Sequence, residues 1–256
     1  MNKENIPPFL ISVIKQGAYK VYELSERILV PPIDKYDFET FKVIDRCLKK
    51  DSNCIDVGAH KGYILSRILK AAPFGKHLAF EPIPYLAERL CKQYKNKVTI
   101  HNKAVSDKVG KADFTLFRSR PAISGFKERD FKSDNYDKEN IIVPVTTLDI
   151  EVGLKNRIDM IKIDVEGAEM QVLLGGTQLI QRYKPIVLFE FTLASKKWFG
   201  TTPEEIYDYF SSADMCISTM SLFLKNCQPF DKHEFCGQFY KGYNYFFIAY
   251  DLQKKY

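Results

Sequence analysis

The sequence lacks a segment that would cross a membrane or act as a secretion leader. It contains no apolar run of about 18 residues, the length that a membrane-spanning helix requires. Its first residues do not combine a basic flank, a long apolar stretch and a small-residue cleavage site. We therefore expect a protein that is neither secreted nor membrane-spanning.

Paired cysteine motifs are also absent. The six cysteines show no C-x-x-C spacing, and Cys54 lies in an apolar run where it acts as a small hydrophobic residue. No cluster of His and Cys indicates a zinc or iron site. These absences favour a reduced, cytoplasmic protein without a zinc or iron centre. The cysteines are Cys47, Cys54, Cys91, Cys216, Cys227 and Cys236.

Charge of one sign is not concentrated anywhere in the sequence. The 38 Lys and Arg residues exceed the 32 Asp and Glu residues by six, and they are spread along the chain. This excess permits an anionic partner without requiring one. With 256 residues and 45% hydrophobic content, the chain can bury one substantial core.

We expect an N-terminal helical extension at residues 1–50 and one domain at residues 51–256. Apolar side chains recur near helical spacing between Pro8 and Leu29, after prolines that suit a helix start. The polar side of this segment mixes Glu23 and Glu26 with lysines, which favours a helix that covers the domain over one that lies on a membrane.

Apolar runs alternate with stretches long enough for a helix. This alternation predicts an α/β fold with a mostly parallel sheet and helices on both faces. The first run starts at Cys54 and ends at or near Asp56, and the later runs are Lys76–Phe80, Val98–His101, Met160–Asp164, Ile186–Phe191 and Tyr245–Tyr250.

A polar insertion interrupts this alternation. Two strand-like pieces, Ala112–Phe117 and Ile141–Val145, flank residues Arg118–Asn140, which carry six basic and five acidic side chains. The insertion also contains Phe126, Phe131 and Tyr136 as apolar anchors. A lid over a substrate site and a simple surface insertion both fit this composition.

The segment Cys54–Tyr63, C-I-D-V-G-A-H-K-G-Y, has the pattern of a strand, a tight turn and a helix over Tyr63–Ala72. Such a junction binds nucleotide-like ligands, because glycines allow close backbone approach and the helix N-terminus offers N–H groups. Dinucleotide binding requires G-x-G-x-x-G, whereas this turn has G-A-H-K-G. With His60 in the middle, the turn better suits a ligand without phosphate, such as S-adenosylmethionine.

Four acidic residues lie at or near the ends of the expected strands: Asp56, Glu81, Asp164 and Glu190. The carboxyl ends of parallel strands form the edge at which open α/β sheets bind ligands. Glu81 follows the glycine turn by about twenty residues, the position from which a carboxylate accepts ribose hydroxyls.

Several motifs together resemble the FkbM family of S-adenosylmethionine-dependent methyltransferases. They are D-V-G-A-H-K-G, F-E-P at Phe80–Pro82, N-K-A-V-S-D at Asn102–Asp107, and K-I-D-V-E-G-A-E at Lys162–Glu169. The resemblance covers about Asn53 to Phe191. It implies a class I methyltransferase Rossmann-like sandwich with a seven-stranded sheet.

The resemblance also implies site roles. The methionine end of the cofactor would be framed by Asp56, Gly58, Ala59, His60 and Gly62. Glu81 would bind the ribose, and the turn containing Asn102, Ala104 and Val105 would border the adenine. Asp164 is expected to contact the cofactor as well.

An acceptor hydroxyl needs a base to remove its proton. Asp164 is the first candidate, followed by Glu190 and Glu166, and a divalent ion between Asp164 and Glu190 is a variant. Lys162 forms either a structural pair with Asp164 or part of the catalytic machinery. Glu166 and Glu169 are expected in the first turn of the next helix.

The family implies O-methylation of a saccharide, glycan or related natural product. A nucleic-acid methyltransferase is one alternative, although the chain lacks an N-P-P-Y segment and a basic stripe. A non-catalytic cofactor-binding partner module is another. Aromatic residues near the C-terminus could stack on sugar rings or form core: Phe230, Phe235, Phe239, Tyr240, Tyr243 and Tyr245.

Overall fold

The computed structural model describes residues 35–127 and 137–256. The chain divides into two compact units, residues 1–38 and 39–256. Both sheets belong to the second unit. The helix expected at Pro8–Leu29 lies outside the described residues, and the division into residues 1–50 and 51–256 stays a prediction.

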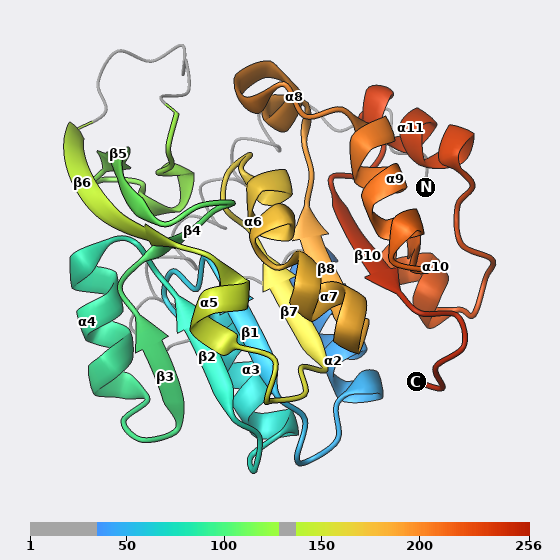
Figure 1. Cartoon of the computed structure of the whole chain (residues 1–256), viewed down its shortest axis with the longest axis horizontal. Helices are drawn as coiled ribbons and strands as arrows, with labels where there is room; N and C mark the ends of the chain where they lie inside the picture. The colour runs from blue at the N-terminus through green and yellow to red at the C-terminus, as the bar shows by residue number, and fades with distance from the viewer. Residues whose placement is uncertain (1–34, 128–136) are drawn as a thin grey trace, which may run out of the picture. The chain divides into compact units, whose positions relative to one another are not determined.

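A seven-stranded sheet forms the centre of the second unit (Figure 1). Strand β10 runs antiparallel to both of its neighbours, and the other neighbouring pairs are parallel. The chain reverses its direction across the sheet between β1 and β7, the kind of switch point where open α/β sheets bind ligands. In spatial order the strands are β3 (Val98–His101), β2 (His77–Phe80), β1 (Cys54–Val57), β7 (Met160–Ile163), β8 (Ile186–Glu190), β10 (Phe246–Tyr250) and β9 (Cys216–Ser218).

Helices cover both faces of the sheet, because its strands carry apolar side chains on both sides. On one face, Leu65 of α3 and Leu90 of α4 pack with Ala79 of β2. On the other, helices α6, α7, α9 and α11 share the main core with Ile55 and Ile161. The helices are α2 (Lys35–Cys47), α3 (Tyr63–Ala71), α4 (Pro84–Gln93), α5 (Leu148–Val152), α6 (Glu169–Gly175), α7 (Thr177–Tyr183), α8 (Leu193–Phe199), α9 (Pro203–Ser212), α10 (Met220–Leu224) and α11 (Lys232–Tyr240), with a 3-10 turn at Pro121–Ile123.

A second, three-stranded sheet follows β3 in the chain. It contains β4 (Ala104–Val105), β6 (Lys138–Thr146) and β5 (Gly110–Phe117), in that spatial order. Strands β5 and β6 form an antiparallel hairpin. Phe114 of β5 and Val143 of β6 pack with Leu86 of α4, so an apolar cluster anchors the hairpin.

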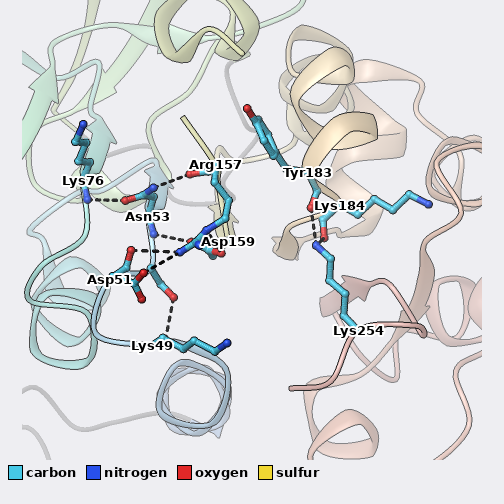
Figure 2. Close-up of polar contacts among 10 residues, drawn as sticks. Lys49, Asp51, Asn53, Lys76, Arg157, Asp159, Tyr183, Lys184 and Lys254 are labelled. Atoms are coloured by element: carbon cyan, nitrogen blue, oxygen red, sulfur yellow. Dashed lines mark hydrogen bonds and ion pairs between the residues drawn. The ribbon is translucent and has the colours of Figure 1, made fainter. Parts of the chain in front are cut away.

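A polar network joins the loops at the amino ends of the parallel strands (Figure 2). Asn53 lies at its centre: its side-chain amide donates to the carbonyl of Arg157 at 2.7 Å and accepts from the N–H of Lys76 at 2.7 Å. Arg157 forms an ion pair with Asp159 at 2.9 Å. These contacts fix the starts of β1, β2 and β7 relative to one another.

The predicted α/β fold with a mostly parallel sheet is confirmed, and the expected main-sheet strands are present with ends within one residue. Strand β9 was not anticipated, because three residues are too short to give a periodic pattern. The polar insertion is shorter than expected, since residues 138–140 belong to β6. Whether it acts as a lid stays a prediction.

No helix within the described ranges is long and apolar enough to span a bilayer. All six cysteines are free thiols. A cytoplasmic location stays a prediction.

Candidate functional site

The turn at residues 58–62, which follows β1 and is called the glycine turn below, lies against the residues that follow β7. Gly58 has φ of 77°, and a Cβ atom there would lie 1.9 Å from the carbonyl oxygen of Asp164. Glycine is therefore required for this close approach. The N–H groups of Gly58 and Ala59 both donate to the carbonyl of Phe80, at 3.0 and 3.1 Å. These two N–H groups are thus engaged within the protein, and the expected free donors at the start of α3 stay a prediction.

Gly62 has a packing role at the start of α3. Its φ is 79°, and a Cβ atom would lie 2.7 Å from Leu90 and 2.8 Å from the ring of Tyr94. The Tyr94 hydroxyl donates to the Gly62 carbonyl at 2.8 Å. Close packing between α3 and α4 explains this glycine, and its expected contact with a cofactor stays a prediction.

His60 occupies the middle of the turn with φ of 50°, a conformation that is uncommon for residues with a side chain. Burial, with help from the neighbouring Lys61, lowers the pKa of its imidazole to about 4, so the ring is neutral at pH 7. Its buried Nε2 atom has no hydrogen-bond partner among the described residues. This position favours a ligand contact over a solvated turn residue, because a buried polar atom is costly unless it is paired.

Glu81 lies directly after β2 and is only 3% exposed. Its carboxylate accepts from the N–H of His60 at 2.7 Å and from the N–H of Ile83 at 2.9 Å. Burial raises the pKa of Glu81 to about 7, although these two N–H donors oppose the rise. Asn102 supports the same loop by donating to the Glu81 carbonyl at 2.9 Å.

Ala104 and Val105 form β4, and both side chains are buried in apolar clusters. A ligand beside this turn would therefore meet their backbone rather than their side chains. Their expected role beside an adenine stays a prediction.

Lys162 of β7 is buried and contacts both the glycine turn and the acidic residues Asp56 and Asp164. Its ammonium lies 3.5 Å from Asp56 Oδ1 and 3.4 Å from Asp164 Oδ2, and it donates to the Gly58 carbonyl at 3.0 Å. Burial alone would lower the pKa of Lys162, but Asp164 and Asp56 outweigh it and raise the pKa. Burial also raises the pKa of Asp56, against the opposing effect of Lys162. The expected pair with Asp164 is confirmed, and Asp56 is a second partner.

The three carboxylates expected to act in catalysis lie together at the carboxyl edge. Carboxylate oxygens of Asp164, Glu166 and Glu190 lie within 4.8 Å of one another. We call these three residues the acid cluster. Such a group can accept a proton from an acceptor hydroxyl, and it can equally hold a hard divalent cation, which prefers carboxylate ligands.

The expected helical position of Glu166 is wrong. Helix α6 begins at Glu169, and Glu166 precedes it with φ of 59°, followed by Gly167 with φ of 111°. These two residues, both with positive φ, form a sharp turn in the connection between β7 and α6. The turn leaves Glu166 beside Asp164 and Glu190 instead of on the helix surface.

Two segments contact this turn from different parts of the chain. A Cβ atom on Gly125, in the polar insertion, would lie 3.5 Å from the Glu166 Cβ. A Cβ atom on Gly167 would lie 3.0 Å from the ring of Phe199 in α8. The described part of the insertion and α8 therefore both border the acid cluster.

Glu169 and Ser195 tie α8 to α6. The buried carboxylate of Glu169 accepts from the Gly167 N–H at 2.9 Å and from Ser195 Oγ at 3.0 Å. Burial raises the pKa of Glu169 to about 7, against these two donors. No sequence pattern indicates this link, because Ser195 lies 26 residues from Glu169 in an ordinary helical segment.

Replacement of Lys162 by Met should lower the free energy of unfolding by about 3–5 kcal/mol, because it leaves the buried Asp56 carboxylate without its partner. Lys155→Met, at an exposed lysine, should change it by at most about 0.5 kcal/mol. Urea denaturation of both variants at pH 7 measures the difference. Equal losses in the two variants would contradict a special role for Lys162.

Two known proteins are similar in sequence to about half of this chain. The 2-O-methyltransferase NoeI of Sinorhizobium fredii is 27% identical over 160 residues, covering 55% of this chain and 64% of NoeI. The AMB antimetabolite synthetase AmbE of Pseudomonas aeruginosa is 27% identical over 165 residues, covering 50% of this chain and 8% of AmbE. The chain thus matches less than two thirds of the length of either relative.

Among solved structures, methyltransferase FkbM from Methylobacillus flagellatus aligns with a TM-score of 0.48 and 14% identity, covering 79% of this chain and 44% of that chain. The family model of the methyltransferase FkbM domain matches residues 56–215. This range is more than half of the chain and contains the glycine turn, Glu81, Lys162 and the acid cluster. The chain therefore belongs to the FkbM family of methyltransferases.

Proposed function

We propose that this chain transfers a methyl group from S-adenosylmethionine to a hydroxyl group of a saccharide or a related hydroxylated metabolite. The observation that carries the proposal is the junction at Lys162, which contacts Asp56 and Gly58 on the glycine turn and Asp164 in the acid cluster. A donor site and an acceptor site would then share one buried ammonium. Membership of a methyltransferase family supports the same chemistry.

The form of the glycine turn supports S-adenosylmethionine over a dinucleotide. A pyrophosphate needs N–H groups directed at it from a flexible turn. Here the N–H groups of Gly58, Ala59 and His60 donate to Phe80 and Glu81 instead. The neutral His60 ring and the buried Asp56 carboxylate suit an uncharged or cationic ligand better than a phosphate.

The residues of the acid cluster would prepare the acceptor. S-Adenosylmethionine supplies a methyl group that is already activated on a sulfonium. The protein then has to align the acceptor hydroxyl and remove its proton, and alignment alone contributes about 7–11 kcal/mol in favourable systems. In this proposal Asp164 accepts the proton of the acceptor hydroxyl, and Glu190 and Glu166 are the alternatives. Lys162 would hold the Asp164 carboxylate in place through their 3.4 Å ion pair.

Exposed tyrosines support a saccharide as the acceptor. Strand β10 begins at the carboxyl edge, where Phe246 is paired with Glu190. Tyr243 and Tyr245, just before this strand, are exposed, whereas Phe235 and Phe239 are buried in the core. Sugar rings stack well on exposed aromatic side chains. The name of the relative NoeI, a 2-O-methyltransferase, agrees with an oxygen acceptor.

Calorimetry with S-adenosylmethionine and with NAD tests the donor. We expect binding of S-adenosylmethionine and none of NAD, and binding of NAD alone would reject the proposed donor.

Transfer of a labelled methyl group to panels of saccharides, small alcohols and RNA tests the acceptor. Transfer to RNA alone would favour a nucleic-acid methyltransferase, and transfer to nothing would favour a non-catalytic module.

Replacement of Asp164 by Asn should lower turnover by about a hundred to ten-thousandfold, because the general base is lost. Donor affinity should change little. Asp113→Asn, at an exposed carboxylate on β5, serves as the control and should leave turnover unchanged. Full turnover in Asp164→Asn would show that Asp164 is not the base. Loss of wild-type turnover after a chelator is added would show that a bound cation, rather than a general base, activates the acceptor hydroxyl.

The raised pKa of Glu81 predicts pH-dependent donor binding. A carboxyl with a pKa of about 7 is ionised at pH 8 and largely protonated at pH 6. Ribose hydroxyls donate best to the ionised form, so the donor dissociation constant should rise by about tenfold from pH 8 to pH 6. Glu81→Gln should bind the donor more weakly and without this part of the pH dependence. Calorimetry from pH 6 to pH 8 measures the donor dissociation constant of both proteins. An equal change of this constant with pH in wild type and Glu81→Gln would contradict the assignment.

A further inference from the structure

The loops at the amino ends of the parallel strands hold the excess positive charge of the chain. These loops, together with the segment after β10, contain ten Lys and Arg residues and four Asp residues, a net charge of +6. The whole chain has the same net charge of +6. The remaining residues are therefore neutral overall. The segments are residues 48–53, 72–76, 94–97, 153–159, 184–185, 213–215 and 251–256.

The negative residues at this edge are largely neutralised. Arg157 pairs with Asp159 and Asp51, and Lys184 pairs with Asp214 at 2.9 Å. Figure 2 shows Arg157, Lys184 and Lys254 in these loops. Seven exposed lysines have no ion pair with any other described residue: Lys49, Lys50, Lys76, Lys95, Lys97, Lys155 and Lys255. We call these seven residues the basic edge.

Two exposed apolar side chains lie within the same loops. Phe74 is 77% exposed and Leu252 is 62% exposed. The Phe74 N–H donates to the Lys50 carbonyl at 2.9 Å, and a Cβ atom on Gly75 would lie 1.8 Å from the carbonyl oxygen of Ser52. The loop with Phe74 is thus pressed against the loop with Lys49 and Lys50. Solvated lysines alone need no partner, but lysines around an exposed phenylalanine fit a surface that is both anionic and apolar.

The position of the basic edge excludes it from the methyl acceptor site. The acid cluster lies at the carboxyl ends of β7 and β8, whereas the lysines of the basic edge lie before the amino ends of β1, β2, β3 and β7 and after β10, at the opposite edge of the sheet. A nucleic acid bound as the acceptor would need its phosphates near the acid cluster, where the chain offers carboxylates. The partner of the basic edge therefore binds at the edge of the sheet opposite the acid cluster.

We propose that the basic edge docks the protein on an anionic lipid bilayer. Each basic residue near an anionic membrane strengthens binding by about fivefold. Phe74 would enter the interfacial region of the bilayer, where aromatic side chains are favoured. This arrangement directs the acid cluster away from the lipid. The contact is peripheral, since no described helix could span the membrane.

Sedimentation with lipid vesicles tests the proposal on the full chain. Vesicles of phosphatidylcholine are compared with vesicles in which roughly one lipid in four is phosphatidylglycerol. We expect binding to the anionic vesicles only, and weaker binding as salt rises.

Matched variants separate the basic edge from general charge. The double variant Lys49→Glu and Lys50→Glu should weaken vesicle binding by at least about tenfold. Lys108→Glu and Lys111→Glu, two exposed lysines at the start of β5, should change it by less than about twofold. Phe74→Ser should weaken binding by about tenfold, whereas Ile142→Ser, at a 70% exposed residue of β6, should not.

Three outcomes would overturn the proposal. They are equal binding to neutral and anionic vesicles, equal loss in the basic-edge and control variants, and displacement from the vesicles by an RNA duplex that the protein binds more tightly. The last would assign the basic edge to a nucleic acid. Circular dichroism of each variant checks that the loss is not caused by unfolding.

Discussion

The ammonium of Lys162 is the interaction on which the candidate site depends. A buried lysine is stable only when its charge is compensated. Here two carboxylates and a carbonyl on two adjacent parallel strands provide the compensation. Because Asp56 and Lys162 are register partners, the pairing of β1 with β7 places the ion pair automatically. The glycine turn and the acid cluster are therefore positioned by the same contact.

Tight backbone packing reinforces this arrangement. Gly58 leaves no space for a side chain beside Asp164, and Gly167 leaves little beside Phe199. The left-handed conformation of Glu166 brings its carboxylate to the neighbouring strand ends. Small changes in any of these residues would move the acid cluster relative to the turn. The site is thus determined by backbone geometry as much as by charged side chains.

The sequence predicted the sheet and the meeting of the acids, because both follow from local rules. Strand ends at one edge of a parallel sheet must come together, so Asp164 and Glu190 were expected near each other. The positions that could not be predicted depend on contacts distant in the sequence. The register of β1 against β7 identifies Asp56 as the second partner of Lys162, and the conformation at Glu166 results from tertiary packing. Strand β9 is defined by its pairing with β10 rather than by its own three residues.

The groups around the Lys162 ammonium also affect cofactor release, the step that follows methyl transfer. Two carboxyl groups, those of Asp56 and Asp164, surround the single ammonium of Lys162. Under the proposed function, the donor enters with a positive sulfonium and leaves as a neutral thioether. The electrostatic attraction that holds the donor would therefore weaken once the reaction is complete. Turnover would be helped by this asymmetry, because the spent cofactor would compete less effectively with fresh donor for the turn at Gly58.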